Sequence, residues 1–189
     1  MEVEDYVKCD TANFNNVKDI IQGKDGMDFD YMFYYIGQVD EQGHSTGFCS
    51  DKYIEKLTVV NDIIESVISL LKENNKFEET YIIWNTDHGA NYLTRKHGYQ
   101  NDDNLLVRSY IMGPNIKKAY KVQNEIKNLD IPATICKILE INPYEEWKSR
   151  VIDEIFEEKI NDNLKEKSEV SVNINDKIGN HANELKFLS

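Results

Sequence analysis

The chain has 189 residues, and its hydrophobic residues (40%) and charged residues (30%) occur in the proportions of a globular domain with one buried core. The formal net charge of −12 makes nucleic acid and anionic membrane surfaces poor partners, so we expect the protein to bind neither. We also expect no membrane insertion and no signal peptide, because no apolar run could span a bilayer and the sequence starts with acidic residues. These features predict no particular cellular compartment.

The first part of the chain predicts a short helix, a buried strand and a loop. Apolar residues recur at helical spacing within residues 14–22, and a glycine-containing turn follows at 23–26. Residues 31–36 are almost continuously apolar and aromatic, which is typical of a strand buried on both faces. We expect a polar, glycine-containing loop over residues 37–50.

The middle of the chain predicts the longest helix and two further strands. Ser50 is a suitable N-cap, and apolar residues recur at helical spacing from there to Leu71. Residues 81–84 predict a second buried strand, and residues 105–112 predict a third strand. A polar loop is expected between these two strands.

The last part of the chain predicts a helix, an amphipathic stretch and a charged tail. Asp130 is the expected helix cap, and Pro132 is placed in the first turn, where proline is tolerated. An amphipathic stretch covers residues 144–156, and beyond it we expect a fraying helix followed by disorder. The predicted organisation is therefore one folded domain over residues 1–156 and a tail over residues 157–189.

Alternation of strands and helices predicts an α/β fold. Its expected form is a three-layer sandwich in which helices cover both faces of a mostly parallel sheet. In such sheets, ligands bind beyond the carboxyl ends of the strands. Both polar loops follow strands, so we expect them to meet at one edge of the sheet.

Three of the four histidines lie in these two loops, and each is next to a glycine. They are His44, His88 and His97. Asp40 precedes the first by four residues, and Asp87 directly precedes the second. Carboxylate oxygens and imidazole nitrogens suit zinc and similar divalent ions, so these five residues are the predicted metal ligands.

Each pattern also has an ordinary explanation when it is taken alone. A D-x-x-x-H spacing is common by chance, and a single histidine such as His97 is most simply a surface residue. The joint occurrence of all three patterns, each after a predicted strand, favours a metal site over these explanations.

Four segments resemble motifs of the alkaline phosphatase superfamily, and the resemblance is closest to its type I phosphodiesterase and nucleotide pyrophosphatase branch. Residues 39–47 (VDEQGHSTG) are similar to the D-x-x-G-H-x-x-G motif. Residues 85–89 (NTDHG) resemble the T/S-D-H-G motif, and residues 96–98 (KHG) resemble the H-G that supplies the last metal-binding histidine. Residues 130–141 are similar to the helix D-x-x-P-T-I…L-G-I. The motifs follow the order of the family and cover roughly residues 1–150.

The resemblance implies an alkaline-phosphatase-like fold and two divalent metal ions, which are usually zinc. By this resemblance, Asp40, His44 and His97 hold one ion, whereas Asp87 and His88 hold the other. The family completes the second site with an aspartate near its N-terminus and with the Thr or Ser nucleophile. The two ions together neutralise charge on the phosphoryl oxygens.

The sequence departs from the family before Asp40, where the nucleophile is expected. No buried strand followed by Asp-Gly and then Thr or Ser is found there, because Asp25-Gly26 follows no apolar run and Thr11 lacks a preceding strand. Ser45 and Thr46 are expected to shape the metal loop. We therefore expect a chain without the N-terminal half of such a domain, with an unidentified nucleophile and an incomplete second metal site.

The function implied by the resemblance is metal-dependent hydrolysis of phosphate monoesters or diesters, with a small-molecule phosphate ester as substrate. An N-terminal half or a second copy of the chain is the expected protein partner, because half of such a sheet leaves apolar faces exposed. Two alternatives remain open: a catalytically inactive metal-binding or structural remnant, and a phosphotransferase or mutase on the same metal core. A sulfatase is not favoured, because the sequence has no C-x-P-x-R motif.

Overall fold

A computed structural model describes residues 2–24, 26 and 30–157. Within these ranges the chain is mixed α/β, with more helix than strand. The predicted tail from residue 158 onward lies outside the described residues. None of the helices in the described ranges combines the length and the apolarity that crossing a bilayer requires.

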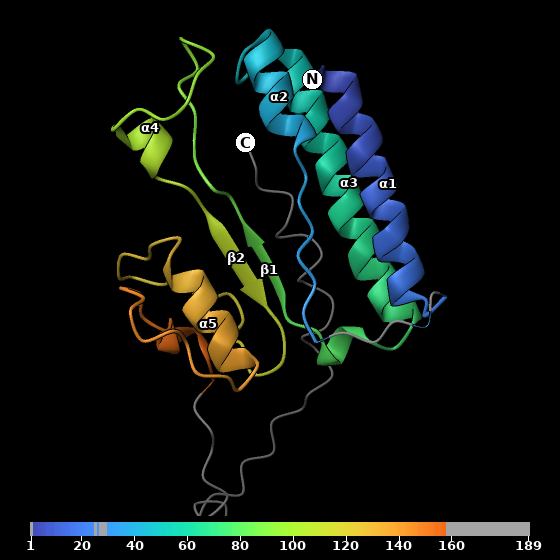
Figure 1. The fold of residues 1–189 in the computed structure, drawn as a ribbon, viewed down its shortest axis with the longest axis vertical. Coiled ribbons are helices and arrows are strands. Elements are labelled where there is room, and N and C mark those ends of the chain that lie inside the picture. The colour runs from blue at the N-terminus through green and yellow to red at the C-terminus, as the bar shows by residue number, and fades with distance from the viewer. Residues whose placement is uncertain (1, 25, 27–29, 158–189) are drawn as a thin grey trace, which may run out of the picture. The chain divides into compact units, whose positions relative to one another are not determined.

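Three helices form the first part of the fold: α1 (Val3–Ile21), α2 (Gln38–Thr46) and α3 (Asp51–Glu73). α1 and α3 lie side by side, and α2 packs against both of them (Figure 1). As predicted, Ser50 caps α3, where its hydroxyl accepts a hydrogen bond from the Tyr53 amide at 3.2 Å. α1 is longer than the predicted helix at 14–22, because its first half carries polar residues that hide the helical pattern.

The first core cluster lies between α1 and α3. It is built on four buried side chains, Val17, Ile21, Leu70 and Leu71. Burial of each such side chain stabilises the fold by about 1.5–3 kcal/mol. Met32 and Tyr34, which precede α2 in the chain, pack against the same cluster.

The predicted strand at 31–36 is extended but is not paired into a sheet in the described structure. Alternate side chains point to opposite sides, as in any extended chain. Met32 and Tyr34 pack inward, whereas Tyr31, Phe33 and Tyr35 are 52%, 76% and 54% exposed. The prediction that this segment is buried on both faces is therefore wrong for the described part of the chain.

Two short strands pair in the second part of the fold: β1 (Ile82–Asn85) and β2 (Ser109–Met112). They are antiparallel, with Ile82 opposite Met112, so the predicted mostly parallel sheet is not what the described strands form. The segment between them contains only the four-residue helix α4 (Asp102–Leu105). Residues 86–108 are enough for a parallel crossover, which needs about a dozen residues or more, so the length of this connection does not determine the antiparallel direction.

Adjacent residues of β1 pack into different clusters. Ile82 packs against the cluster of α1 and α3, whereas Ile83 packs against a second cluster. The buried members of this second cluster are Ile116, Ile131, Ile152 and Ile155. The β1 strand is therefore covered by apolar side chains on both of its faces.

α5 (Asp130–Ile138) supplies Ile131 to the second cluster, whereas Ile116 comes from the chain before this helix, and Ile152 and Ile155 come from the chain after it. The sequence predicted Asp130 as the cap of α5, but the structure contradicts this prediction: Asp130 is the first residue of the helix. Its buried carboxylate accepts backbone hydrogen bonds from Lys127 and Arg150, each at 2.9 Å. The predicted amphipathic stretch at 144–156 contains only the short 3-10 helix η2 (Asp153–Ile155). A second such turn, η1 (Phe77–Glu79), precedes β1.

Candidate metal centre

The segment predicted as a polar loop after residue 37 is the helix α2, and this determines how two predicted ligands are placed. Asp40 and His44 are four residues apart, which puts them on one face of the helix, one turn apart. The His44 Nε2 atom lies 3.5 Å from a carboxylate oxygen of Asp40. Two donors of a metal site are thus fixed by local helix geometry.

His97 returns to α2 through a tight turn after β1. The backbone of Asn91 pairs with that of Lys96, and the Asn91 side chain accepts hydrogen bonds from the Leu93 and Thr94 amides. This turn reverses the chain and brings the His97 Nε2 atom to 3.7 Å from the second carboxylate oxygen of Asp40. The two predicted loops therefore meet, as expected from their positions after predicted strands.

The geometry of these three residues fits one divalent cation. Ligand atoms of Asp40, His44 and His97 all lie within 4.8 Å of one another. Atoms bound to a tetrahedral zinc at about 2.0–2.2 Å lie roughly 3.4 Å apart, so the three donors, one from each residue, need to draw together slightly around an ion. The three side chains are 40%, 34% and 31% exposed in chain order, so solvent or a substrate can reach the site.

The backbone of Arg95 determines which nitrogen of His44 faces Asp40. The His44 Nδ1 atom lies 2.8 Å from the Arg95 carbonyl oxygen, which can only accept a hydrogen bond. Nδ1 therefore carries the proton in neutral His44, and Nε2 keeps its lone pair for a metal ion. The Arg95 guanidinium also donates to the Ser45 carbonyl at 3.0 Å, which ties this turn to the end of α2.

Asp87 and His88 lie next to this group but offer fewer donors. The His88 Nε2 atom is 3.5 Å from an Asp87 carboxylate oxygen, and the His88 ring stacks on His97 with centroids 3.8 Å apart. Within the described ranges, Asp40, His44 and His97 form the only group of three metal-binding side chains. The two remaining predicted ligands thus have no third protein donor there, and they fit a second ion only incompletely.

Two glycines of the motifs are required for close packing of another segment. A Cβ atom on Gly43 would lie 2.1 Å from the Phe48 ring, which packs edge-on against His44. A Cβ atom on Gly89 would lie 2.0 Å from the backbone oxygen of Asp103. Each glycine lets another segment approach the chain that carries a predicted ligand.

The sequence did not single out three residues that support this centre. Asp10 accepts hydrogen bonds from the amides that begin α2, and the Asn128 side chain donates to the Asp87 carbonyl at 2.9 Å. Tyr35 lies beside the predicted ligands: partial burial and then the charges of Asp87 and Asp40 raise the pKa of its hydroxyl.

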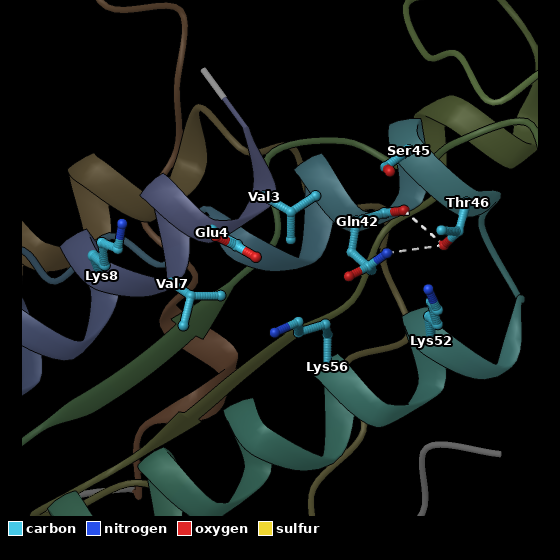
Figure 2. A pocket seen from close by; sticks show the side chains of 9 residues that line it. All are labelled: Val3, Glu4, Val7, Lys8, Gln42, Ser45, Thr46, Lys52 and Lys56. Carbon is cyan, nitrogen blue, oxygen red and sulfur yellow. Dashed lines mark hydrogen bonds between the residues drawn. The ribbon is translucent and has the colours of Figure 1, made fainter.

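A groove of about 490 Å³ lies on another side of α2, between the first turns of α1 and α3 (Figure 2). Ser45 and Thr46 line it, together with the exposed lysines Lys8 and Lys52 and the half-buried Lys56. The Thr46 hydroxyl is occupied by hydrogen bonds with Gln42 (Figure 2). None of the predicted metal ligands lines this groove.

The described residues thus define a mixed α/β protein with a candidate site for a divalent cation. The chain belongs to the type I phosphodiesterase / nucleotide pyrophosphatase family, which it matches over residues 4–187. This family is part of the alkaline phosphatase superfamily, so the resemblance predicted from the four motifs is confirmed. No solved structure matches the chain.

Proposed function

We propose that this protein takes part in metal-dependent hydrolysis of phosphate monoesters or diesters, with Asp40, His44 and His97 as ligands of a zinc ion. The observation that carries the proposal is the convergence of these three side chains from α2 and from the turn after β1. Family membership supports a phosphate ester as the class of substrate. Asp87 and His88 are the proposed donors of a second divalent ion.

In this proposal, some side chains bind the ion and others orient the residues that bind it. Asp40 offers one carboxylate oxygen toward each imidazole, so a single carboxylate neutralises part of the charge at the centre. In neutral His44 the Arg95 carbonyl places the proton on Nδ1 and leaves Nε2 as the metal-binding atom, and the stacked His88 ring limits rotation of His97. When bound, divalent ions supply the positive charge that stabilises phosphoryl oxygens during displacement.

We further propose that the described residues form part of an alkaline-phosphatase-like three-layer sandwich with a larger, mostly parallel sheet. The two faces of β1 support this proposal, because one packs toward α1 and α3 and the other toward α5. The antiparallel strand β2 is compatible with it, since large mixed sheets commonly carry an antiparallel strand. The exposed side chains of residues 31–35 are suited to contact with further polypeptide.

The nucleophile is proposed to come from a polypeptide segment other than the described residues, such as an N-terminal half of the domain. The two hydroxyls nearest to His44 in sequence, Ser45 and Thr46, line the groove that contains no predicted metal ligand. In α2, Asp40 and His44 share a face from which Thr46 points away. These hydroxyls therefore shape the helix end and do not attack phosphorus.

The proposal is tested by measuring zinc content, inorganic phosphate binding and hydrolysis of p-nitrophenyl phosphate and bis(p-nitrophenyl) phosphate. We expect the purified chain to retain about one zinc per molecule, to bind phosphate only when zinc is present, and to hydrolyse both esters negligibly by itself. His97→Ala should lower the zinc content, because it removes one of three protein ligands. His181→Ala, which changes the fourth histidine of the chain, is the matched control and should leave it unchanged.

Each result has a distinct consequence. Absence of zinc, or equal zinc in the wild type and His97→Ala, contradicts the metal site. Zinc without phosphate binding contradicts the ester function and favours the alternative of a metal-binding or structural module. Rapid ester hydrolysis by the chain alone contradicts the assignment of the nucleophile to another segment.

A further inference from the structure

We propose that Asp10 is a positioning residue for the metal centre: its buried carboxylate anchors the beginning of α2 and thereby sets where Asp40 and His44 lie. The proposal rests on the proposed function for its consequence, which is zinc affinity. The anchoring itself is seen in the hydrogen bonds of Asp10 and does not depend on the proposed function.

The Asp10 carboxylate is buried and directed at the backbone of another helix. Asp10 belongs to α1 and is only 2% exposed. Its two oxygens lie 3.2 and 3.1 Å from the Gly37 amide nitrogen, and one of them lies 2.9 Å from the Gln38 amide nitrogen. Both oxygens are therefore engaged by amide protons, which assigns the carboxylate to holding the backbone and not to binding an ion.

These contacts supply a cap that α2 does not have in its own sequence. The residue before α2 is Gly37, which has no side chain, so no side-chain cap exists there. The first amides of a helix have no partner within the helix, so a group that accepts their hydrogen bonds stabilises the helix. A carboxylate at this end also interacts favourably with the positive end of the helix dipole. Asp10 provides both effects from 27 residues away in the sequence.

Close contacts around Gly37 hold α1 and α2 together at this point. A Cβ atom on Gly37 would lie 2.8 Å from the Tyr6 ring of α1. The Tyr34 hydroxyl donates to the backbone oxygen of Asp10 at 3.4 Å, and burial followed by the charge of Asp10 raises its pKa to about 12. The carboxylate thus occupies a fixed position relative to the segment that leads into α2.

The distance from this anchor to the ligands is short. Asp40 is only two residues beyond Gln38, and His44 lies one turn further along the same rigid helix. A change in the direction of the first turn therefore moves both ligands relative to His97, which is held by a different segment. Hydrogen bonds made to the metal ligands themselves change affinity by about 10–100-fold. The Asp10 contacts act through the backbone of α2, so we expect an effect at the lower end of this range.

The test compares Asp10→Asn with a core variant of the full chain. Asparagine has the shape of aspartate, but it lacks the charge and turns one acceptor into an NH₂ group that repels the amides. In the metal-free protein we expect Asp10→Asn to accelerate amide hydrogen exchange in residues 38–46. In chelator-competition titrations we expect zinc to bind about 10-fold more weakly. Leu70→Ala, a buried residue of α3, is the control: it should lower the Tm but leave zinc affinity within about twofold.

Two results would overturn the proposal: unchanged exchange in residues 38–46, or a loss of zinc affinity no larger than that of Leu70→Ala. If Asp10→Asn does not fold, Asp10→Glu replaces it, because glutamate keeps the charge on a longer side chain; the same directions with smaller changes are expected. If the wild type binds no zinc, the proposed function fails, whereas the exchange measurement still decides whether Asp10 anchors α2.

Discussion

Gly43 shows how the metal centre depends on the absence of a single methyl group. Replacing it by alanine places a Cβ atom 2.1 Å from the Phe48 ring, which is nearly buried and packs edge-on against His44. The ring has to move, and overpacking of this kind costs about 1–3 kcal/mol. We expect Gly43→Ala to lower the Tm and zinc affinity together, as measured by calorimetry and chelator competition.

Gly98→Ala provides a comparison at a second glycine next to a histidine. A Cβ atom there meets nothing within 4 Å, although its positive φ of 90° strains any other residue. We expect this substitution to affect stability through the backbone while leaving Phe48 in place. A Gly43→Ala variant with wild-type zinc affinity would contradict the packing argument.

The residues of the centre were predictable only where their chemistry is visible in one stretch of sequence. Histidines next to glycine, two of them with an aspartate nearby, indicated possible ligands, and the structure brings these five predicted ligands close together. Asp10 and Asn128 support the site from distant positions, and their side chains carry no local signal of that role. The contribution of Arg95 comes from its backbone oxygen, which every residue has.

An ion pair between Arg150 and Glu154 links η2 to the chain that precedes it. The two guanidinium nitrogens each lie 2.9 Å from a carboxylate oxygen of Glu154. The hydrogen bond from Arg150 lowers the pKa of Glu154 to about 2, from an ordinary value of 4.5. Because the folded pKa is the lower one, the pair stabilises the fold above about pH 4.5, and this contribution is lost as the pH falls toward 2.

Glu154→Gln should therefore make the protein modestly less stable at pH 7 and less sensitive to acid between pH 4.5 and 2. The measurement is the free energy of unfolding from urea titrations at several pH values in that interval. Glu146→Gln, which makes the same charge change at an exposed position, is the control and should keep the wild-type pH profile. Identical slopes for wild type and Glu154→Gln would show that the pair does not contribute.

At the scale of elements, length and periodicity decided which predictions were confirmed. The long amphipathic pattern of α3 and the Ser50 cap gave the helix and its start correctly. α2 was missed because it is short, polar and interrupted by Gly43, and its first amides are capped by a residue outside the helix. The apolar run at 31–36 predicted a strand, since local composition does not reveal whether a pairing partner is present.

For the whole molecule, the alternating exposure of residues 31–35 predicts self-association. Tyr31, Phe33 and Tyr35 present three aromatic side chains on one side of an extended segment. Exposed apolar groups of this kind favour contact with a second copy. We expect sedimentation velocity to show concentration-dependent association that Phe33→Ser reduces. Leu93→Ser is the matched control, because Leu93 is also 76% exposed but lies in a different segment; equal effects of both substitutions would argue against a specific contact.

The sequence predicted that the protein is α/β, but it did not predict the relative direction of the two strands. Alternating helices and strands correctly indicated an α/β protein, and four ordered motifs indicated its family. The relative direction of β1 and β2 depends on how the chain between them turns, and the polar sequence there fits either direction. The antiparallel direction of β1 and β2 therefore depends on tertiary packing and could not be predicted from local sequence patterns.

The central claim is that Asp40, His44 and His97 bind one zinc ion together. X-ray absorption spectroscopy of the zinc-loaded chain tests it most directly, because this method identifies the atoms around the metal. The account predicts a shell of nitrogen and oxygen atoms at about 2.0–2.2 Å, with two imidazoles in the wild type and one in His97→Ala. A sulfur shell, or an identical spectrum for both proteins, would contradict it.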